Sequence, residues 1–140
     1  MFTKLGRHLL NRRGIAATEF ALLAPLLLLA ILSAHDVANQ VQTSMRLERA
    51  ARTGAQQAAA DPSDLAAIRT RVIAAWPELT EADVPLPVLA CECAASPVAC
   101  DQPCPGGLAR LLTVTAHRAL TPHLLSGLTT GTGHAVLRLR

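Results

Sequence analysis

Residues 14 to 34 read GIAATEFALLAPLLLLAILSA, and this stretch decides how the chain is organised. It contains one ionisable side chain, that of Glu19. At about 1.5 Å per residue, a helix of this length is roughly 30 Å long, which matches the hydrocarbon core of a bilayer. Because the stretch is apolar on every side, we expect a retained transmembrane helix over residues 15–36.

Two alternatives compete with a membrane helix. A cleaved signal peptide also has a basic start and an apolar centre, but it needs small residues at fixed positions before its cleavage site. The bulky Leu32 spoils both candidate sites, Leu32-Ser33-Ala34 and Ala30-Ile31-Leu32. A buried core helix is disfavoured because a chain of 140 residues could hardly cover it.

The basic residues predict the orientation of this helix. The net charge is +3, and four basic residues without any acidic one precede Ile15, namely Lys4, Arg7, Arg12 and Arg13. The positive-inside rule therefore places a basic leader, residues 1–14, in the cytoplasm and the rest of the chain outside. A binder of nucleic acid is disfavoured, because basic and acidic residues balance after His35 and only 2% of the residues are aromatic.

Two residues interrupt the apolar stretch. An acid at the bilayer centre costs about 2.5 to 3.5 kcal/mol, so Glu19 is a functional candidate unless it reaches the headgroups near Gly14. Pro25 removes one backbone hydrogen bond, which a membrane helix tolerates when its neighbours compensate. We expect Pro25 to kink the membrane helix.

Beyond the membrane we expect a helical stalk over residues 37–60. Apolar side chains recur near helical spacing at Val37, Val41, Met45, Ala51, Ala55 and Ala58. Glu48 and Arg52 form a favourable i,i+4 pair, whereas Gly54 weakens the helix prediction. The apolar stripe fits packing on the chain's own domain and packing on other filament subunits equally well.

The remaining residues, 61–140, predict a small α+β domain with one helix and three strands. Asp61 is the expected N-cap of the helix, and Pro77 ends it. The apolar face of the helix comprises Leu65, Ile68, Val72, Ile73 and Trp76, and Trp76 is favoured as a core anchor over a ligand platform. The expected strands cover residues 88–94, 111–120 and 134–140, and Gly131-Thr132-Gly133-His134 is interpreted as a turn.

Four cysteines gather in a Pro- and Gly-rich segment at Cys91, Cys93, Cys100 and Cys104. In an exported domain this favours two disulfides. Their pairing stays open, although a bond between Cys91 and Cys93 is the least favoured. The alternatives are a four-thiolate zinc site, which lacks the usual Cys-x2-Cys spacing, and a redox pair, which lacks Cys-x-x-Cys.

Catalytic motifs are missing from the sequence. It has no Gly-x-Ser-x-Gly elbow, no phosphate-binding loop and no His-Glu-x-x-His. The histidines His35, His117, His123 and His134 are scattered and lack a nearby partner for acid-base chemistry. We expect a protein that is not an enzyme and needs no cofactor or metal.

The start of the chain resembles a known family. Arg12-Arg13-Gly14 followed by IAATEF is similar to the processing motif of type IV prepilins, with Glu19 at the fifth mature position. The longer stretch RRGIAATEFALLAPLLLLAIL resembles the TadE-like family, the pseudopilin-like proteins of the tight-adherence (Flp) pilus system. The segment QTSMRLERAARTGAQQAAA fits the family's second helical stretch. The four-cysteine segment and His35-Asp36-Val37-Ala38-Asn39 depart from the family pattern.

The resemblance implies a function for the motif. A prepilin peptidase would cleave between Gly14 and Ile15, and Glu19, with Phe20 beside it, would register one subunit on the next by pairing with the new amino group. It implies a single-pass protein of the bacterial inner membrane whose partners are pilin or pseudopilin subunits and other pilus-assembly proteins. Whether cleavage occurs is left open. The alternative is a signal-anchored periplasmic binding or redox module that works through its four-cysteine loop.

Overall fold

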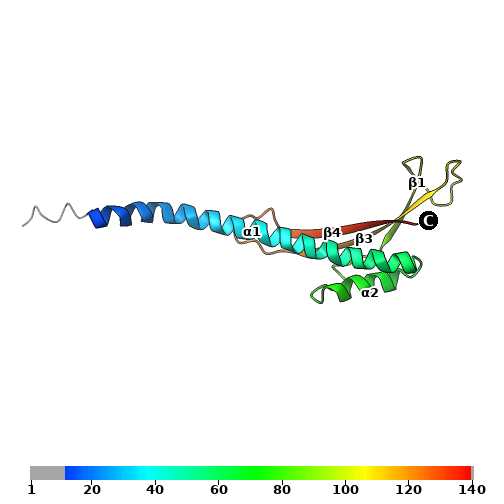
Figure 1. Cartoon of the computed structure of the whole chain (residues 1–140), viewed down its shortest axis with the longest axis horizontal. Coiled ribbons are helices and arrows are strands. Elements are labelled where there is room, and N and C mark those ends of the chain that lie inside the picture. The colour runs from blue at the N-terminus through cyan, green and yellow to red at the C-terminus, as the bar shows by residue number, and fades with distance from the viewer. Residues whose placement is uncertain (1–11, 140) are drawn as a thin grey trace, which may run out of the picture.

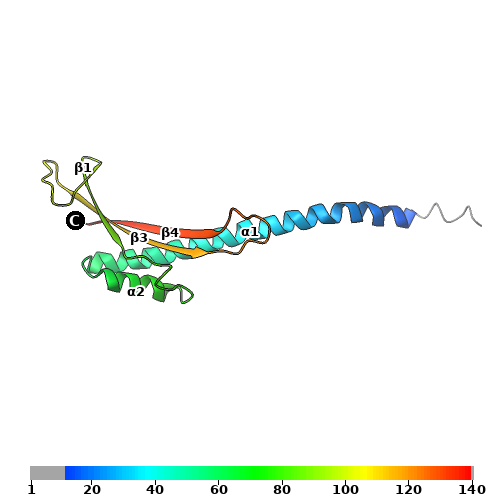
Figure 2. The same cartoon turned by 180° about the vertical axis from the view of Figure 1, so that it is seen from behind.

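A single helix dominates the molecule. The structure is a computed structural model that describes residues 12–139, with side chains described from residue 17 onward. Figures 1 and 2 show helix α1 (Arg12–Ala60) as a long rod that carries a small globular part at its carboxyl-terminal end. The helix runs unbroken from Gly14 to Ala60, as expected. Lys4 and Arg7 of the basic leader lie outside the described residues.

The globular part adds one short helix and one antiparallel sheet to the second half of α1. The strand order in the sheet is β2-β1-β3-β4, with every neighbouring pair antiparallel. The α+β layout is therefore confirmed. The elements after α1 are α2 (Leu65–Ala75), β1 (Val88–Cys93), β2 (Ser96–Val98), β3 (Ala109–Ala119) and β4 (Thr130–Leu139).

The sheet has four strands where the sequence predicted three. The missed strand, β2, is three residues long and contains Pro97, so it has neither the length nor the alternation that indicates a strand. The other strands lie close to their expected positions. The largest shift is in β4, which begins four residues before the expected start at His134.

The core lies between the second half of α1, the sheet and α2. In β3, Leu112, Val114 and Ala116 point inward and are buried, whereas the residues between them are more exposed. Figures 1 and 2 both show α1 running along β3 and β4. The core residues contributed by the two helices are Leu47, Ala50, Ala51, Ala58, Ile68 and Val72.

Three glycines allow α1 to approach its neighbours closely. A side chain at Gly131 would lie 2.8 Å from Thr43 Cγ2, and one at Gly133 would collide with the backbone of Leu47 and Glu48. The turn expected at Gly131-Thr132-Gly133-His134 is thus wrong, because these residues belong to β4. Alternate residues of a strand share one face, so Gly131 and Gly133 leave the face toward α1 without side chains. A side chain at Gly54 would likewise collide with Val72 of α2, so this glycine lets α1 and α2 pack closely.

Helix α2 begins later than expected. Asp64, not Asp61, is its N-cap and accepts a hydrogen bond from the Ala67 amide at 2.8 Å. Asp61 instead accepts hydrogen bonds from the amide and the hydroxyl of Ser63, and these bonds lower the pKa of the Asp61 carboxyl. The expected apolar face of α2 is confirmed, with Ile68 and Val72 fully buried.

Trp76 packs at the end of α2 against the core, as expected of a core anchor. The guanidinium groups of Arg46 and Arg118 lie 5.9 and 5.2 Å from its ring centroid. Arg118 also pairs with Glu78 at 3.0 Å, which ties the segment between α2 and β1 to strand β3. In the same segment Thr80 donates its hydroxyl and amide to Asp83, and these bonds lower the pKa of Asp83.

Candidate functional site

The expected processing bond lies in the helical part of the chain. Gly14 and Ile15 both belong to α1, whose described part begins at Arg12. Cleavage between them stays a prediction.

The two residues expected to register subunits both face outward. Glu19 and Phe20 are exposed, and the Phe20 side chain is 65% accessible. Among the residues with described side chains, 17–139, the ion pairs are Arg52–Glu48, Arg69–Glu81 and Arg118–Glu78, so Glu19 takes part in none of them. Its carboxylate is consequently directed at the surroundings of the chain.

The apolar stretch around these residues has no cover within the chain. It forms the only helical segment in residues 12–139 that is apolar and long enough to span a membrane, and none of its most apolar window is buried. Leu22 is 79% accessible and Ile31 is 65% accessible. The alternative of a buried core helix is therefore wrong. An apolar surface of this extent needs lipid or neighbouring helices.

Pro25 lies inside the helix and does not end it. Figure 1 shows α1 passing through this region as one ribbon. The expected kink at Pro25 stays a prediction.

A carboxylate marks the point where the apolar stretch meets the globular part. Asp36 is buried, and its two oxygens accept hydrogen bonds from the amides of His123, Leu124 and Leu125 at 2.9, 2.7 and 2.9 Å. These residues belong to the loop that joins β3 to β4. Sequence patterns did not predict this contact, and their only signal was an acidic residue two positions after Ala34, the end of the apolar run.

The apolar stripe expected on the second half of α1 packs on the chain's own domain only in part. Ala51 and Ala58 are buried against the core, as expected, but Val37, Val41 and Met45 are about half exposed. The buried positions in that region are Asp36, Thr43 and Leu47. The polar residues Asp36 and Thr43 occupy the inward face because the loop amides and the bare Gly131 meet them there.

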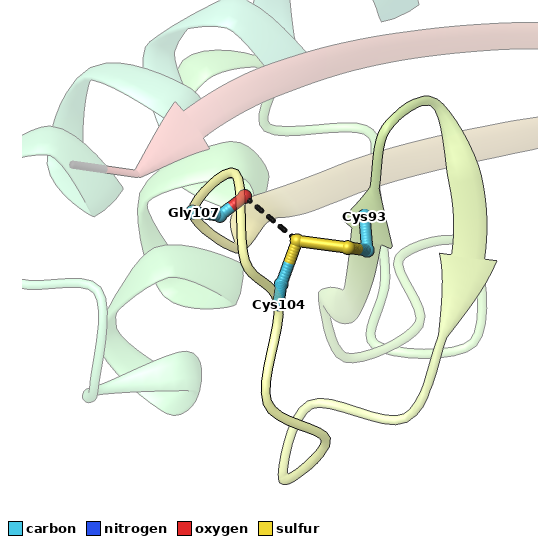
Figure 3. Close-up of a disulfide and its surroundings, with 3 residues drawn as sticks. All are labelled: Cys93, Cys104 and Gly107. Atoms are coloured by element: carbon cyan, nitrogen blue, oxygen red, sulfur yellow. Dashed lines mark hydrogen bonds between the residues drawn. A yellow bond between two sulfur atoms is a disulfide. The ribbon is translucent and has the colours of Figure 1, made fainter.

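The four cysteines form two disulfides, as expected. They join Cys91 to Cys100 and Cys93 to Cys104, and no free cysteine remains. Figure 3 shows Cys104 Sγ beside the Gly107 carbonyl oxygen, at 3.2 Å. A disulfide sulfur carries no hydrogen, so this is a close polar contact and not a donated bond.

The two disulfides close the loop at the end of the molecule farthest from the apolar stretch (Figure 1). The β1–β2 turn that they enclose contains Ala94 and Ala95 with positive φ, at 50° and 63°. A four-thiolate zinc site is ruled out because every sulfur is bonded. In the described residues no cluster of three or more histidine, cysteine or acidic side chains could hold a metal ion.

Comparison with known proteins finds a match for the first part of the chain and none for the rest. Residues 14–56 match the family model described as TadE-like protein. The matched segment covers the processing motif, the apolar stretch and most of the half of α1 that packs on the sheet, whereas the sheet and the disulfide loop lie beyond it. No curated protein and no solved structure matches the chain significantly. Over residues 14–56 the chain is similar to the TadE-like family, and the resemblance seen in the sequence is confirmed for that segment.

Proposed function

We propose that this protein is a membrane-anchored, non-catalytic, pseudopilin-like component of tight-adherence pilus assembly. The observation that carries the proposal is the TadE-like match over residues 14–56. That segment combines Gly14, Glu19 and an apolar helix that the chain itself leaves uncovered. A helix with an open apolar surface and an outward-facing carboxylate is suited to assembly with other helices.

We further propose that residues 1–14 lie in the cytoplasm, residues 15–36 span the bacterial inner membrane, and residues 37–140 lie in the periplasm. The basic residues before Ile15 support this orientation through the positive-inside rule. Two disulfides in the globular part support an oxidising compartment for it.

In this proposal Gly14 and Glu19 act in successive steps. A prepilin peptidase cleaves after Gly14 and leaves Ile15 with a free α-amino group. Glu19 of a neighbouring pilin-like subunit then pairs with that amine, which removes two isolated charges from the lipid together.

The decisive experiment is the intact mass of the chain purified from its native host. We expect a mature protein that lacks Met1 to Gly14. Gly14→Leu should yield an uncut, membrane-inserted protein and block pilus assembly. Glu19→Leu should be cut and should insert at least as well, and it should fail mainly in association with its partners.

Glu19→Gln serves as the matched control for charge, because it keeps the shape and hydrogen-bonding ability of the side chain. It should fail as Glu19→Leu does if the negative charge is what matters. Piliation that survives substitution of both Gly14 and Glu19, but not loss of the four cysteines, would instead identify the disulfide loop as the working part of a signal-anchored module.

A further inference from the structure

The two edges of the sheet are protected to very different degrees. At one edge, β2 is three residues long, contains Pro97 and is held by the disulfides on either side of it. Short strands and prolines are common ways to prevent an edge from pairing with another chain. At the other edge, β4 (Thr130–Leu139) is ten residues long and has no proline.

The register shows which backbone groups of β4 point away from the sheet. The Leu120 amide donates to the Thr129 carbonyl at 2.8 Å, one step beyond the pair Ala119 and Thr130. Antiparallel pairs alternate between hydrogen-bonded and non-bonded ones. The odd-numbered residues of β4 therefore bond to β3, and the even-numbered residues turn their N–H and C=O groups to the open edge.

One of these outward groups already has a partner, and it confirms the alternation. Gln40 Nε2 donates to the Thr130 carbonyl at 2.9 Å, from α1 to the start of β4. Within residues 17–139, no recorded hydrogen bond reaches the outward backbone groups of His134 or Val136. The edge is thus closed by a side chain at one end and open along its middle.

A groove runs beside this open stretch. It has a volume of about 550 Å³ and lies between α1 and residues 134–137 of β4. Its apolar surface comes from Ala55, Ala59, Ala135 and Leu137. Its charged rim includes Arg52 and Glu48, which pair at 2.8 Å with 66% and 47% of their side chains exposed.

We propose that the open edge of β4 binds an extended strand from a different protein chain, which adds to the sheet and places alternate side chains in this groove. Edge strands recognise peptides in this way, because the backbone bonds provide affinity and the groove selects side chains. The small residues Ala55 and Ala59 leave space for aliphatic side chains. Exposed Arg138 and His134 flank the site, so the partner strand carries an acidic residue at its end near Arg138.

A second copy of this chain is a poor occupant. A symmetric antiparallel pair of β4 strands would reverse one copy relative to the other, and Figures 1 and 2 show that β4 runs along α1. The two apolar stretches would then point in opposite directions, which two copies anchored in one membrane cannot do. The β2 edge of a second copy offers only three residues with Pro97 at the centre.

The test uses the full chain in detergent micelles and a synthetic peptide of about seven residues with alternating valine and threonine and one terminal glutamate. Saturable binding should slow the amide exchange of His134 and Val136, while the amides of Ala135 and Leu137, already bonded to β3, change little. A peptide with lysine in place of glutamate should bind several-fold more weakly.

Two substitutions of Val136 distinguish binding through the backbone of β4 from binding through side-chain contact alone. Val136→Pro removes an outward N–H group and should weaken binding by at least about tenfold, whereas Val136→Thr keeps that group and should bind as the wild type does. Retained Trp76 fluorescence would show that each variant is folded.

Three results would overturn the proposal. They are the absence of saturable binding to the wild-type chain, equal binding by Val136→Pro, and slowed exchange at His134 and Val136 that depends on protein concentration without peptide. The last result would identify a second copy as the occupant.

Discussion

The two halves of α1 have the same backbone and opposite surroundings. In the first half Leu22 and Leu26 are 79% and 64% accessible, whereas in the second half Leu47 and Ala51 are fully buried. The first half is apolar on all sides and has large side chains, so no single neighbour within the chain could cover it. The second half has a narrow inward face in which Leu47 lies among alanines, and the sheet and α2 together cover it. Side-chain size and distribution, and not helix propensity, separate the membrane part from the globular part.

The largest expected effect comes from opening the core of the second half. Leu47→Ala removes a fully buried side chain and should lower the free energy of unfolding of the globular part by about 2 to 5 kcal/mol. Val41→Ala, six residues earlier on the same helix and 51% exposed, should change it by less than about 0.5 kcal/mol. Urea titration followed by Trp76 fluorescence measures both. Equal losses would show that Val41 is packed within the folded chain.

A matched pair of acidic substitutions tests whether the halves differ in environment. Leu27 and Met45 are 51% and 49% accessible. Leu27→Asp should impair membrane insertion by about 2.5 to 3.5 kcal/mol, because it places a charge in the bilayer. Met45→Asp should insert normally, because that residue lies beyond the apolar stretch. Alkaline extraction of membranes measures the inserted fraction, and equal insertion of the two variants would argue against a transmembrane first half.

A smaller effect is expected from filling the space between α1 and β4. Gly133→Val introduces a strand-favouring side chain that collides with the α1 backbone, so it should cost about 1 to 3 kcal/mol of stability. Gly127→Val is the control, since a side chain there meets no atom within 4 Å. The same fluorescence titration applies. If Gly133→Val were as stable as Gly127→Val, the close approach of helix and strand would be wrong.

The helical form and the apolar surface of the first half of α1 could be predicted from the sequence, whereas for the second half only the helical form could be. An uninterrupted apolar run such as residues 14–34 needs no partner to be recognised. The inward face of the second half depends on what covers it, so the sequence left open whether Val37, Val41 and Met45 pack on the chain's own domain, and the structure leaves them about half exposed. Asp36 is buried because the amides of the loop before β4 bond to it, and Thr43 is buried because Gly131 of β4 has no side chain to keep it away. The periodicity of α1 alone cannot reveal either neighbour.

The candidate site divides in the same way. The two disulfides followed from the cysteines and the expected compartment, but their pairing needed the β1–β2 hairpin that the sequence did not predict. Gly131 and Gly133 indicated a turn when considered alone. Only their two-residue spacing, which puts both on one face of a strand, pointed to a close backbone contact.

The smallest expected effect lies at the junction of the two halves. Asp36→Ala removes the acceptor for the amides of His123, Leu124 and Leu125. Because His123 and Leu124 are exposed, water replaces part of what is lost, and global stability should fall less than in Gly133→Val. The local effect should be larger, with amide exchange at these three residues accelerated by about tenfold or more. Asp36→Asn keeps one acceptor oxygen and should give an intermediate acceleration. Unchanged exchange in Asp36→Ala would mean that the β3–β4 loop holds its shape without α1, and the junction would then be a simple connection between two independent parts.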